Sequence, residues 1–198
     1  MKTNTMKTKK GFTLLELLIV IGILAILSTT VVLVINPAQL LKKARDSQRI
    51  SDLNTLKTAI AYYITETASP GIGAVAESYS DVAGNLCFGT ISTATSTTVG
   101  VDGWIPIAFD GMAGGSPIGS LPHDPNQSAV TGDYYYSYGA NADFTFKLVA
   151  NMESTYYSQG ETGDVESTDG GTESTLYEVG TDMSRTIIVA GPTCYPSR

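Results

Sequence analysis

The sequence is poor in the side chains that most catalytic sites need. It contains one histidine, His123, one tryptophan and two cysteines in 198 residues. Ser/His hydrolases and most zinc sites use imidazole as a base or as a ligand. A chain with a single histidine offers few of the side chains that such sites require. His123 also lies in the segment Leu-Pro-His-Asp-Pro, which is typical of a turn. We therefore expect no catalytic residues and no enzymatic activity.

Charged residues are also scarce, at 16% of the chain, and they are unevenly distributed. Residues 1–60 carry nine basic and three acidic side chains, whereas residues 61–198 carry three basic and sixteen acidic ones. An acidic outer part does not offer the positive surface that nucleic acids require, so no nucleic-acid partner is expected. The basic residues flank an apolar segment, where anionic lipid is the better match.

The longest apolar segment runs from Phe12 to Ile35 and contains one charged residue, Glu16. As a helix it would extend about 36 Å, which exceeds the hydrocarbon core of a bilayer, about 30 Å thick. Four lysines and no acidic residue precede it, so the positive-inside rule keeps residues 1–11 cytoplasmic and sends residues 36–198 across. The segment is too long for a cleaved secretory signal. We expect a single-pass membrane protein with an extracytoplasmic head.

Glu16 is unusual because a carboxylate inside an apolar helix is costly. The cost is about 2.5–3.5 kcal/mol at mid-bilayer and less near the end of the helix. One interpretation is that a cationic partner compensates for the charge. The other is that the carboxylate is tolerated because it reaches the membrane surface.

Residues 9–16, Lys-Lys-Gly-Phe-Thr-Leu-Leu-Glu, and the apolar run after them resemble the class III signal of type IV pilins and of type II secretion pseudopilins. The resemblance implies that a prepilin peptidase cleaves between Gly11 and Phe12 and methylates the new amino terminus. Gly11 suits this role because its backbone is unhindered.

The resemblance also implies that Glu16 recognises the amino terminus of an adjacent subunit. The α-amino group of Phe12 would lie four residues before Glu16, a helical spacing at which opposite charges meet. Buried among apolar helices, the pair would set the axial register between subunits, because a mismatch leaves a charge unpaired.

The helical pattern continues after an interruption at Asn36-Pro37. A proline there removes one backbone hydrogen bond, so we expect a helix kink at Pro37, near residues 33–36. Residues 38–66 predict an amphipathic helix that packs on the head. Its charges, including Asp46/Arg49 and Arg49/Asp52 at i, i+3, are interpreted as a solvated face. The apolar stripe comprises Leu40, Leu41, Ala44, Ile50, Leu53, Leu56, Ile60, Tyr63 and Ile64.

The remaining residues predict a small antiparallel sheet among loops. Residues 71–132 are rich in Gly, Ser, Thr and Ala, with core contacts expected at Trp104, Ile105, Ile107 and Phe109. Residues 133–138 are rich in tyrosine, and residues 144–152 alternate with the period of a half-buried strand, which predicts a hairpin. A last strand is expected at residues 186–190. This hairpin region also resembles the sheet of the major pseudopilins.

Residues 153–185 are acidic and loop-like. Major pseudopilins hold calcium in a loop of the same region, so the resemblance suggests a Ca²⁺ site at Asp164, Glu166 and Asp169. Their spacing does not match an EF-hand, and a solvated acidic loop is the favoured alternative. No other cofactor is expected.

Cys87 and Cys194 lie on the side of the membrane that is expected to be oxidising, and we expect a disulfide between them. Such a bond would close a loop of roughly a hundred residues and stabilise the head by about 4–5 kcal/mol in the chain-entropy model. Two separate thiols are the alternative.

The predicted fold is α+β, with a long amino-terminal helix packed on a small antiparallel sheet, as in pilins. The predicted parts are a cleaved leader (1–11), a transmembrane and assembly helix (12–35), its amphipathic continuation (36–66) and an extracytoplasmic head (67–198).

The predicted function is a structural subunit of a type IV pilus or pseudopilus, displayed at the cell surface after assembly. Its expected partners are identical or related subunits, the prepilin peptidase, the pilus or type II secretion assembly machinery, and membrane lipid before assembly. The alternative is a signal-anchored monomeric surface protein whose head binds a ligand.

Overall fold

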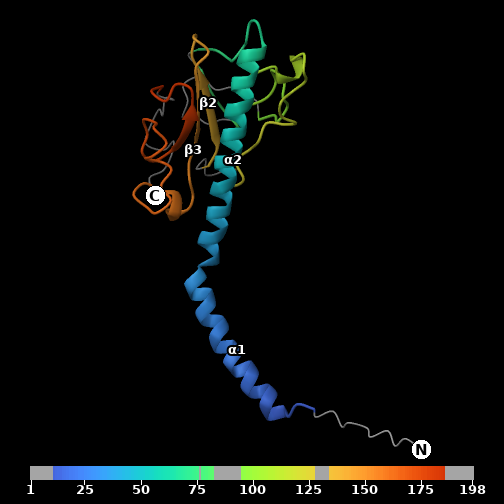
Figure 1. Ribbon diagram of the computed structural model, residues 1–198, viewed down its shortest axis with the longest axis vertical. Coiled ribbons are helices and arrows are strands. Elements are labelled where there is room, and N and C mark those ends of the chain that lie inside the picture. The colour runs from blue at the N-terminus through green and yellow to red at the C-terminus, as the bar shows by residue number, and fades with distance from the viewer. Residues whose placement is uncertain (1–10, 76, 83–94, 128–133, 186–198) are drawn as a thin grey trace, which may run out of the picture. The chain divides into compact units, whose positions relative to one another are not determined.

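The computed structural model describes residues 11–75, 77–82, 95–127 and 134–185 (Figure 1). The chain divides into two compact units, one that ends at Leu40 and one that begins at Leu41. The α+β class predicted from the sequence is confirmed, with long helices at the amino-terminal end and a small antiparallel sheet in the second unit.

Helix α1, Leu14–Ile35, belongs to the first unit. The described side chains from Phe12 to Ile35 are all exposed. It is the one helix of the described residues that is long and apolar enough to cross a membrane, over Leu14–Val32.

Asn36 separates α1 from helix α2, Pro37–Glu66. Its backbone is left-handed, with φ 43° and ψ 79°, a conformation that asparagine tolerates better than most residues. A proline disfavours helical geometry in the residue before it and suits the first position of a new helix. The carbonyl oxygen of Asn36 accepts from the backbone N–H of Gln39 at 3.0 Å, so the hydrogen bonds of α2 begin directly after the end of α1.

The sheet has four strands in the order β1-β2-β3-β4, and all neighbours are antiparallel. The strands are β1 (Ser78–Ser80), β2 (Tyr136–Ala140), β3 (Phe146–Ala150) and β4 (Tyr177–Gly180). Two short 3-10 helices, Phe109–Gly111 and Thr155–Tyr157, lie in the connections. The predicted hairpin corresponds to β2 and β3, with Tyr138 opposite Leu148.

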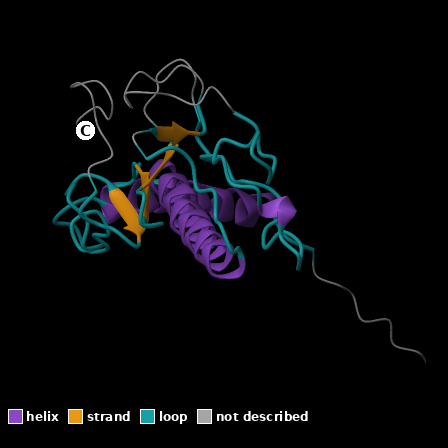
Figure 2. Ribbon diagram, turned by 90° about the horizontal axis from the view of Figure 1, so that it is seen from above, coloured by secondary structure: helices purple, strands orange, loops and turns teal. Residues whose placement is uncertain are grey.

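The core lies between α2 and the sheet (Figures 1 and 2). Leu53, Leu56 and Ile60 of α2 are fully buried against Tyr136, Tyr138 and Leu148 of the sheet. The predicted core contacts Trp104, Ile105, Ile107 and Phe109 are all completely buried.

Three expectations about α2 and the sheet need correction. The apolar stripe of α2 is buried only in its later part, since Leu40, Leu41 and Ala44 are exposed. Strand β3 is buried on both faces, because loop residues cover the face that carries Lys147. Strand β4 lies in a region expected to be loop.

The expected strand at residues 186–190 lies outside the described residues, as do Cys87 and Cys194.

Candidate functional site

Three exposed residues, Gly11, Phe12 and Thr13, precede α1, and the backbone of Thr13 is extended. The Phe12 side chain is 87% exposed. A Cβ atom added to Gly11 would meet no other atom within 4 Å. The packing of this chain therefore does not require glycine at position 11, so a requirement for it would come from a partner.

Thr13 and Glu16 form a capping box at the start of α1. The Thr13 hydroxyl accepts from the backbone N–H of Glu16, and the Glu16 carboxylate accepts from the backbone N–H of Thr13, both at 3.2 Å. This exchange satisfies two backbone donors that a helix start leaves open. It also holds the carboxylate at the end of the helix that the macrodipole makes positive.

The capping box was missed in the sequence, although its signal was present. The pattern Thr-x-x-Glu directly before an apolar helix is the signature of this motif. It gives Glu16 a local partner, which the two earlier interpretations of its charge did not include.

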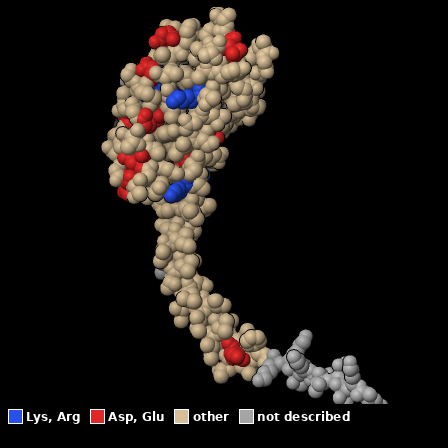
Figure 3. Space-filling model, in the orientation of Figure 1, with Lys and Arg blue, Asp and Glu red and all other residues tan. Residues whose placement is uncertain are grey.

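The surface of α1 is apolar all around. Figure 3 shows uncharged side chains along the visible face of α1, with one acidic patch near its start, and Glu16 is the one charged residue of the segment. A helix that is hydrophobic on every side requires cover from lipid or from other helices. The side chains of this helix that the structure describes are exposed.

A second notable feature lies in the other unit, where Arg49 of α2 is completely buried. Its guanidinium donates to Asp124 through two hydrogen bonds of 2.7 Å, to Glu153 at 2.6 Å and to Asp46 at 2.7 Å. Arg45, one turn earlier, donates to both carboxylate oxygens of Glu153 at 2.8 and 2.6 Å. We call these five residues the Arg49 cluster.

The Asp46 carboxylate connects α2 to the chain that follows β3. It accepts from the backbone N–H groups of Glu153 and Ser154, both at 2.8 Å. The Arg49 cluster thus joins one face of α2 to two segments that are far away in the sequence. The charges of Asp46 and Arg49 do not form the solvated face that we expected, and Asp52 is bound by the hydroxyl of Tyr136 at 2.9 Å.

The protonation equilibria reflect this arrangement. Burial raises the pKa of Asp124, and the single guanidinium of Arg49 only partly offsets it. Burial acts in the same direction on Glu153, but hydrogen bonds from both arginines outweigh it and lower the pKa of that carboxyl group. The two arginines thus favour the charged form of Glu153.

A second buried ion pair crosses the sheet. Lys147 on β3 and Glu178 on β4 are almost completely buried, with Nζ and Oε1 2.5 Å apart. Lys147 also donates to the carbonyl oxygens of Met183 and Arg185 and to the hydroxyl of Thr172. Through these hydrogen bonds and the ion pair, Lys147 anchors residues 172–185 to the sheet.

The three calcium candidates are engaged separately in loop contacts. Asp164 accepts from the backbone N–H groups of Gly160 and Ser167, and Glu166 accepts from that of Gln159. Asp169 accepts from the backbone N–H of Gly171 at 2.7 Å and of Glu178 at 2.6 Å. Within the described ranges, no three His, Cys, Asp or Glu residues are grouped as metal ligands.

Residues 6–32 match the family model of the prokaryotic N-terminal methylation motif. This motif is the class III prepilin signal, so the resemblance to type IV pilins and pseudopilins is confirmed over this part of the chain. The match includes Gly11, Phe12 and Glu16. No curated protein and no solved structure matches the chain.

Proposed function

We propose that the chain is a structural subunit of a type IV pilus or pseudopilus. A prepilin peptidase cleaves it after Gly11 and methylates Phe12, and the mature chain polymerises through α1. The observation that carries the proposal is the methylation motif over residues 6–32, which includes most of an apolar helix whose described side chains are exposed.

The exposed start of α1 supports processing. Gly11 and Phe12 are exposed and lie outside the helix, so a protease can bind the backbone without unfolding a helix. Cleavage removes the four lysines of the leader and leaves α1 attached to the rest of the chain. The product is still an anchored protein, because α1 is long enough to span the bilayer.

The apolar surface of α1 supports assembly. In the membrane, lipid covers this surface, and the head stays on the extracytoplasmic side. In a fibre, the α1 helices of neighbouring subunits replace the lipid and form the core. Pilus or secretion machinery must extract the helix, because apolar side chains do not leave the bilayer spontaneously.

Glu16 gives this assembly its register. After cleavage, Phe12 carries an α-ammonium group one residue before Thr13, so a cation and the Glu16 carboxylate lie at the same end of α1. The ammonium of one subunit can pair with the carboxylate of a neighbour at a single axial offset. The capping box holds the carboxylate close to the helix start in the meantime.

The Arg49 cluster and the disulfide expected between Cys87 and Cys194 would stabilise the head of a fibre subunit. A fibre subunit is exposed outside the cell, where a head fixed to α2 by several buried charges resists local opening.

Electron microscopy of cells that express the chain, beside cells that lack it, tests the proposal. Surface fibres or sheared filaments that contain the chain and disappear with it are expected. A monomeric, unprocessed protein that remains in the membrane would contradict the proposal and favour a signal-anchored surface protein with a ligand-binding head.

A further inference from the structure

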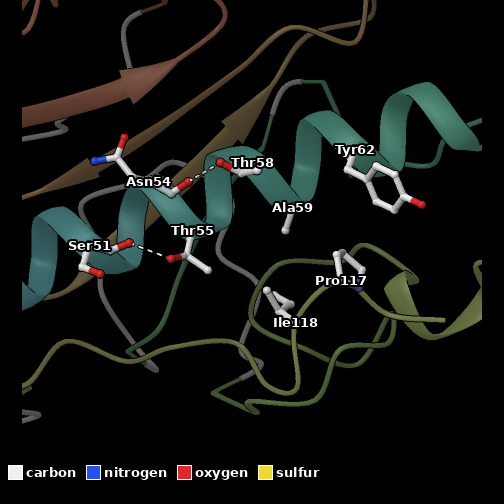
Figure 4. Close-up of a pocket in the computed structure, with 8 residues that line it drawn as sticks. All are labelled: Ser51, Asn54, Thr55, Thr58, Ala59, Tyr62, Pro117 and Ile118. Atoms are coloured by element: carbon white, nitrogen blue, oxygen red, sulfur yellow. Dashed lines mark hydrogen bonds between the residues drawn. The ribbon is translucent and has the colours of Figure 1, made fainter. Parts of the chain in front are cut away.

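A shallow groove of about 540 Å³ lies along α2, where residues 117–118 approach the helix (Figure 4). We call it the α2 groove. Its lining includes Thr55, Thr58, Ala59, Tyr62 and Ile118. Figure 4 shows these side chains around a common space, with Tyr62 at one end.

The α2 groove is more apolar than its sequence indicates. The hydroxyls of Thr55 and Thr58 donate to the carbonyl oxygens of Ser51 and Asn54 in the preceding turn, both at 2.8 Å (Figure 4). These hydroxyls are therefore satisfied within α2, and the threonines contribute methyl groups to the surface. Together with Ala59 and the aromatic ring of Tyr62, these methyl groups form an apolar surface, and burying it against a partner is favourable because water is released.

An exposed aromatic side chain lies elsewhere on the same unit. Phe144 is in the turn between β2 and β3, where its side chain is 44% exposed. Its backbone has φ 64°, a left-handed conformation that bulky residues rarely adopt. Turns of this kind normally place glycine or asparagine at such a position.

The turn holds Phe144 firmly in this conformation. The backbone N–H of Asn141 donates to the carbonyl oxygen of Thr145 at 2.8 Å, and the N–H of Phe144 donates to that of Asn141 at 3.2 Å. The Asp143 carboxylate accepts from the Thr145 hydroxyl at 2.6 Å. An aromatic side chain that is held in a strained backbone conformation and is still 44% exposed points to a role outside its own chain.

Charge complementarity connects the two features. Asp143, directly before Phe144, is exposed, and hydrogen bonds from Thr145 lower the pKa of its carboxyl group, so it is anionic at neutral pH. Lys57 lies on α2 beside Thr58 and Tyr62, in a hollow adjoining the α2 groove. Lys57 forms no ion pair with any residue that the structure describes.

We infer that Phe144 of one subunit docks in the α2 groove of a neighbouring copy of this chain, with Asp143 facing Lys57. The inference rests on the proposed function, because it needs a polymer. It adds a contact between heads to the contact between α1 helices.

The geometry of the pair suits a filament. The aromatic and the groove are different patches of one surface, so the contact is head to tail rather than self-complementary. Contacts of that type propagate from copy to copy, and they form open filaments when the rotation does not close a ring. Phe144 is not among the residues that line the groove of its own chain, so a contact between the two would join different copies.

Phe144→Gly tests the contact in the full-length chain, expressed in its own cells. Glycine accepts the left-handed backbone, so the head should melt at the same temperature or higher, and cleavage should be unchanged. The amount of sheared fibre should fall several-fold. Ala142→Gly is the matched control, because it removes an exposed side chain from the same turn and should leave fibre yield unchanged.

Photocrosslinking identifies the partner surface directly. Phe144 is replaced by p-benzoylphenylalanine, which keeps an aromatic ring at the turn, and sheared fibres are irradiated. We expect crosslinked dimers in which residue 144 is joined to a peptide containing residues 51–62. Wild-type fibre yield from Phe144→Gly, or crosslinks only to other segments, would overturn the inference while leaving the proposed function intact. Absence of fibres and of cleavage in the wild type would overturn both.

Discussion

Arg49 and Asp124 form a buried bidentate ion pair, with both hydrogen bonds 2.7 Å long, although they are 75 positions apart in the sequence. Arginine is suited to this geometry because its planar guanidinium matches the two oxygens of a carboxylate. The pair fixes α2 to the segment after Pro122, and Asp124 is itself held by its backbone N–H, which donates to Asp81 at 2.8 Å.

Arg49→Met should strongly destabilise the head. The substitution leaves the carboxylates of Asp46, Asp124 and Glu153 buried without their shared cation, and breaking a buried pair from one side typically costs about 3–5 kcal/mol. Urea unfolding of a fragment that begins at Leu41 would measure the loss. Arg45→Met is the matched control, because the Arg45 side chain is 31% exposed and its removal should cost about 1 kcal/mol or less. Equal losses for the two variants would contradict this account.

The stability of the head should also depend on His123. A hydrogen bond with Asp81 raises the pKa of His123, although burial acts against it. Because folding raises this pKa, the stabilisation is fully present below the unfolded value of about 6.5 and is lost as the pH rises through the folded value. The histidine Nδ1 also lies 3.2 Å from Nε2 of Gln127, which can donate to the neutral ring.

Wild-type head should therefore lose about 0.5–1 kcal/mol of stability between pH 5.5 and pH 8.5, relative to His123→Gln. Unfolding in urea at the two pH values measures the difference, with the variant correcting for all other groups. The same pH dependence in both proteins would show that His123 contributes nothing.

Glu16→Gln separates the register role of Glu16 from its role in the capping box. Glutamine preserves the capping box but removes the charge. If charge pairing with a neighbouring Phe12 sets the register, Glu16→Gln and Glu16→Leu should both reduce sheared fibre while leaving the processed subunit in the membrane. Thr13→Val is the control, since it removes the capping hydroxyl and keeps the carboxylate. Normal fibre yield from Glu16→Gln would reject the register role.

Gly11→Val should block processing without disturbing the fold. A side chain at position 11 meets no atom of this chain within 4 Å, so a defect would arise in the peptidase, where a β-branched residue crowds the backbone. An immunoblot of membranes should show the longer precursor accumulating. Mature protein of normal mobility would place the cleavage site elsewhere.

Local features of this chain could be predicted, and distant pairings could not. The apolar helix and the position of the helix break follow from contiguous residues, because periodicity and proline act over a few positions. The same local logic recognised Asp46 and Arg49 as an i, i+3 pair. The contacts of Arg49 with Asp124 and Glu153 could not be predicted in this way, because those residues are distant in the sequence. These contacts bury the charges that were expected to form a solvated face.

The errors in the sheet have the same origin. Lys147 alternates with apolar neighbours, which indicates a solvent-facing side chain unless another segment covers it. Here residues 172–185 provide that cover and Glu178 provides the counter-charge. The four residues of β4 carry too weak a pattern to stand out from an acidic loop, and only pairing with β3 defines them.

The mass of the amino-terminal peptide of the mature chain tests the central claim most directly. Protein recovered from sheared fibres or, before assembly, from membranes would be digested and analysed by mass spectrometry. The account predicts a first peptide that begins at Phe12 and carries one added methyl group on its α-amino nitrogen. A first peptide that begins at Met1, in a chain that retains residues 1–11, would contradict it.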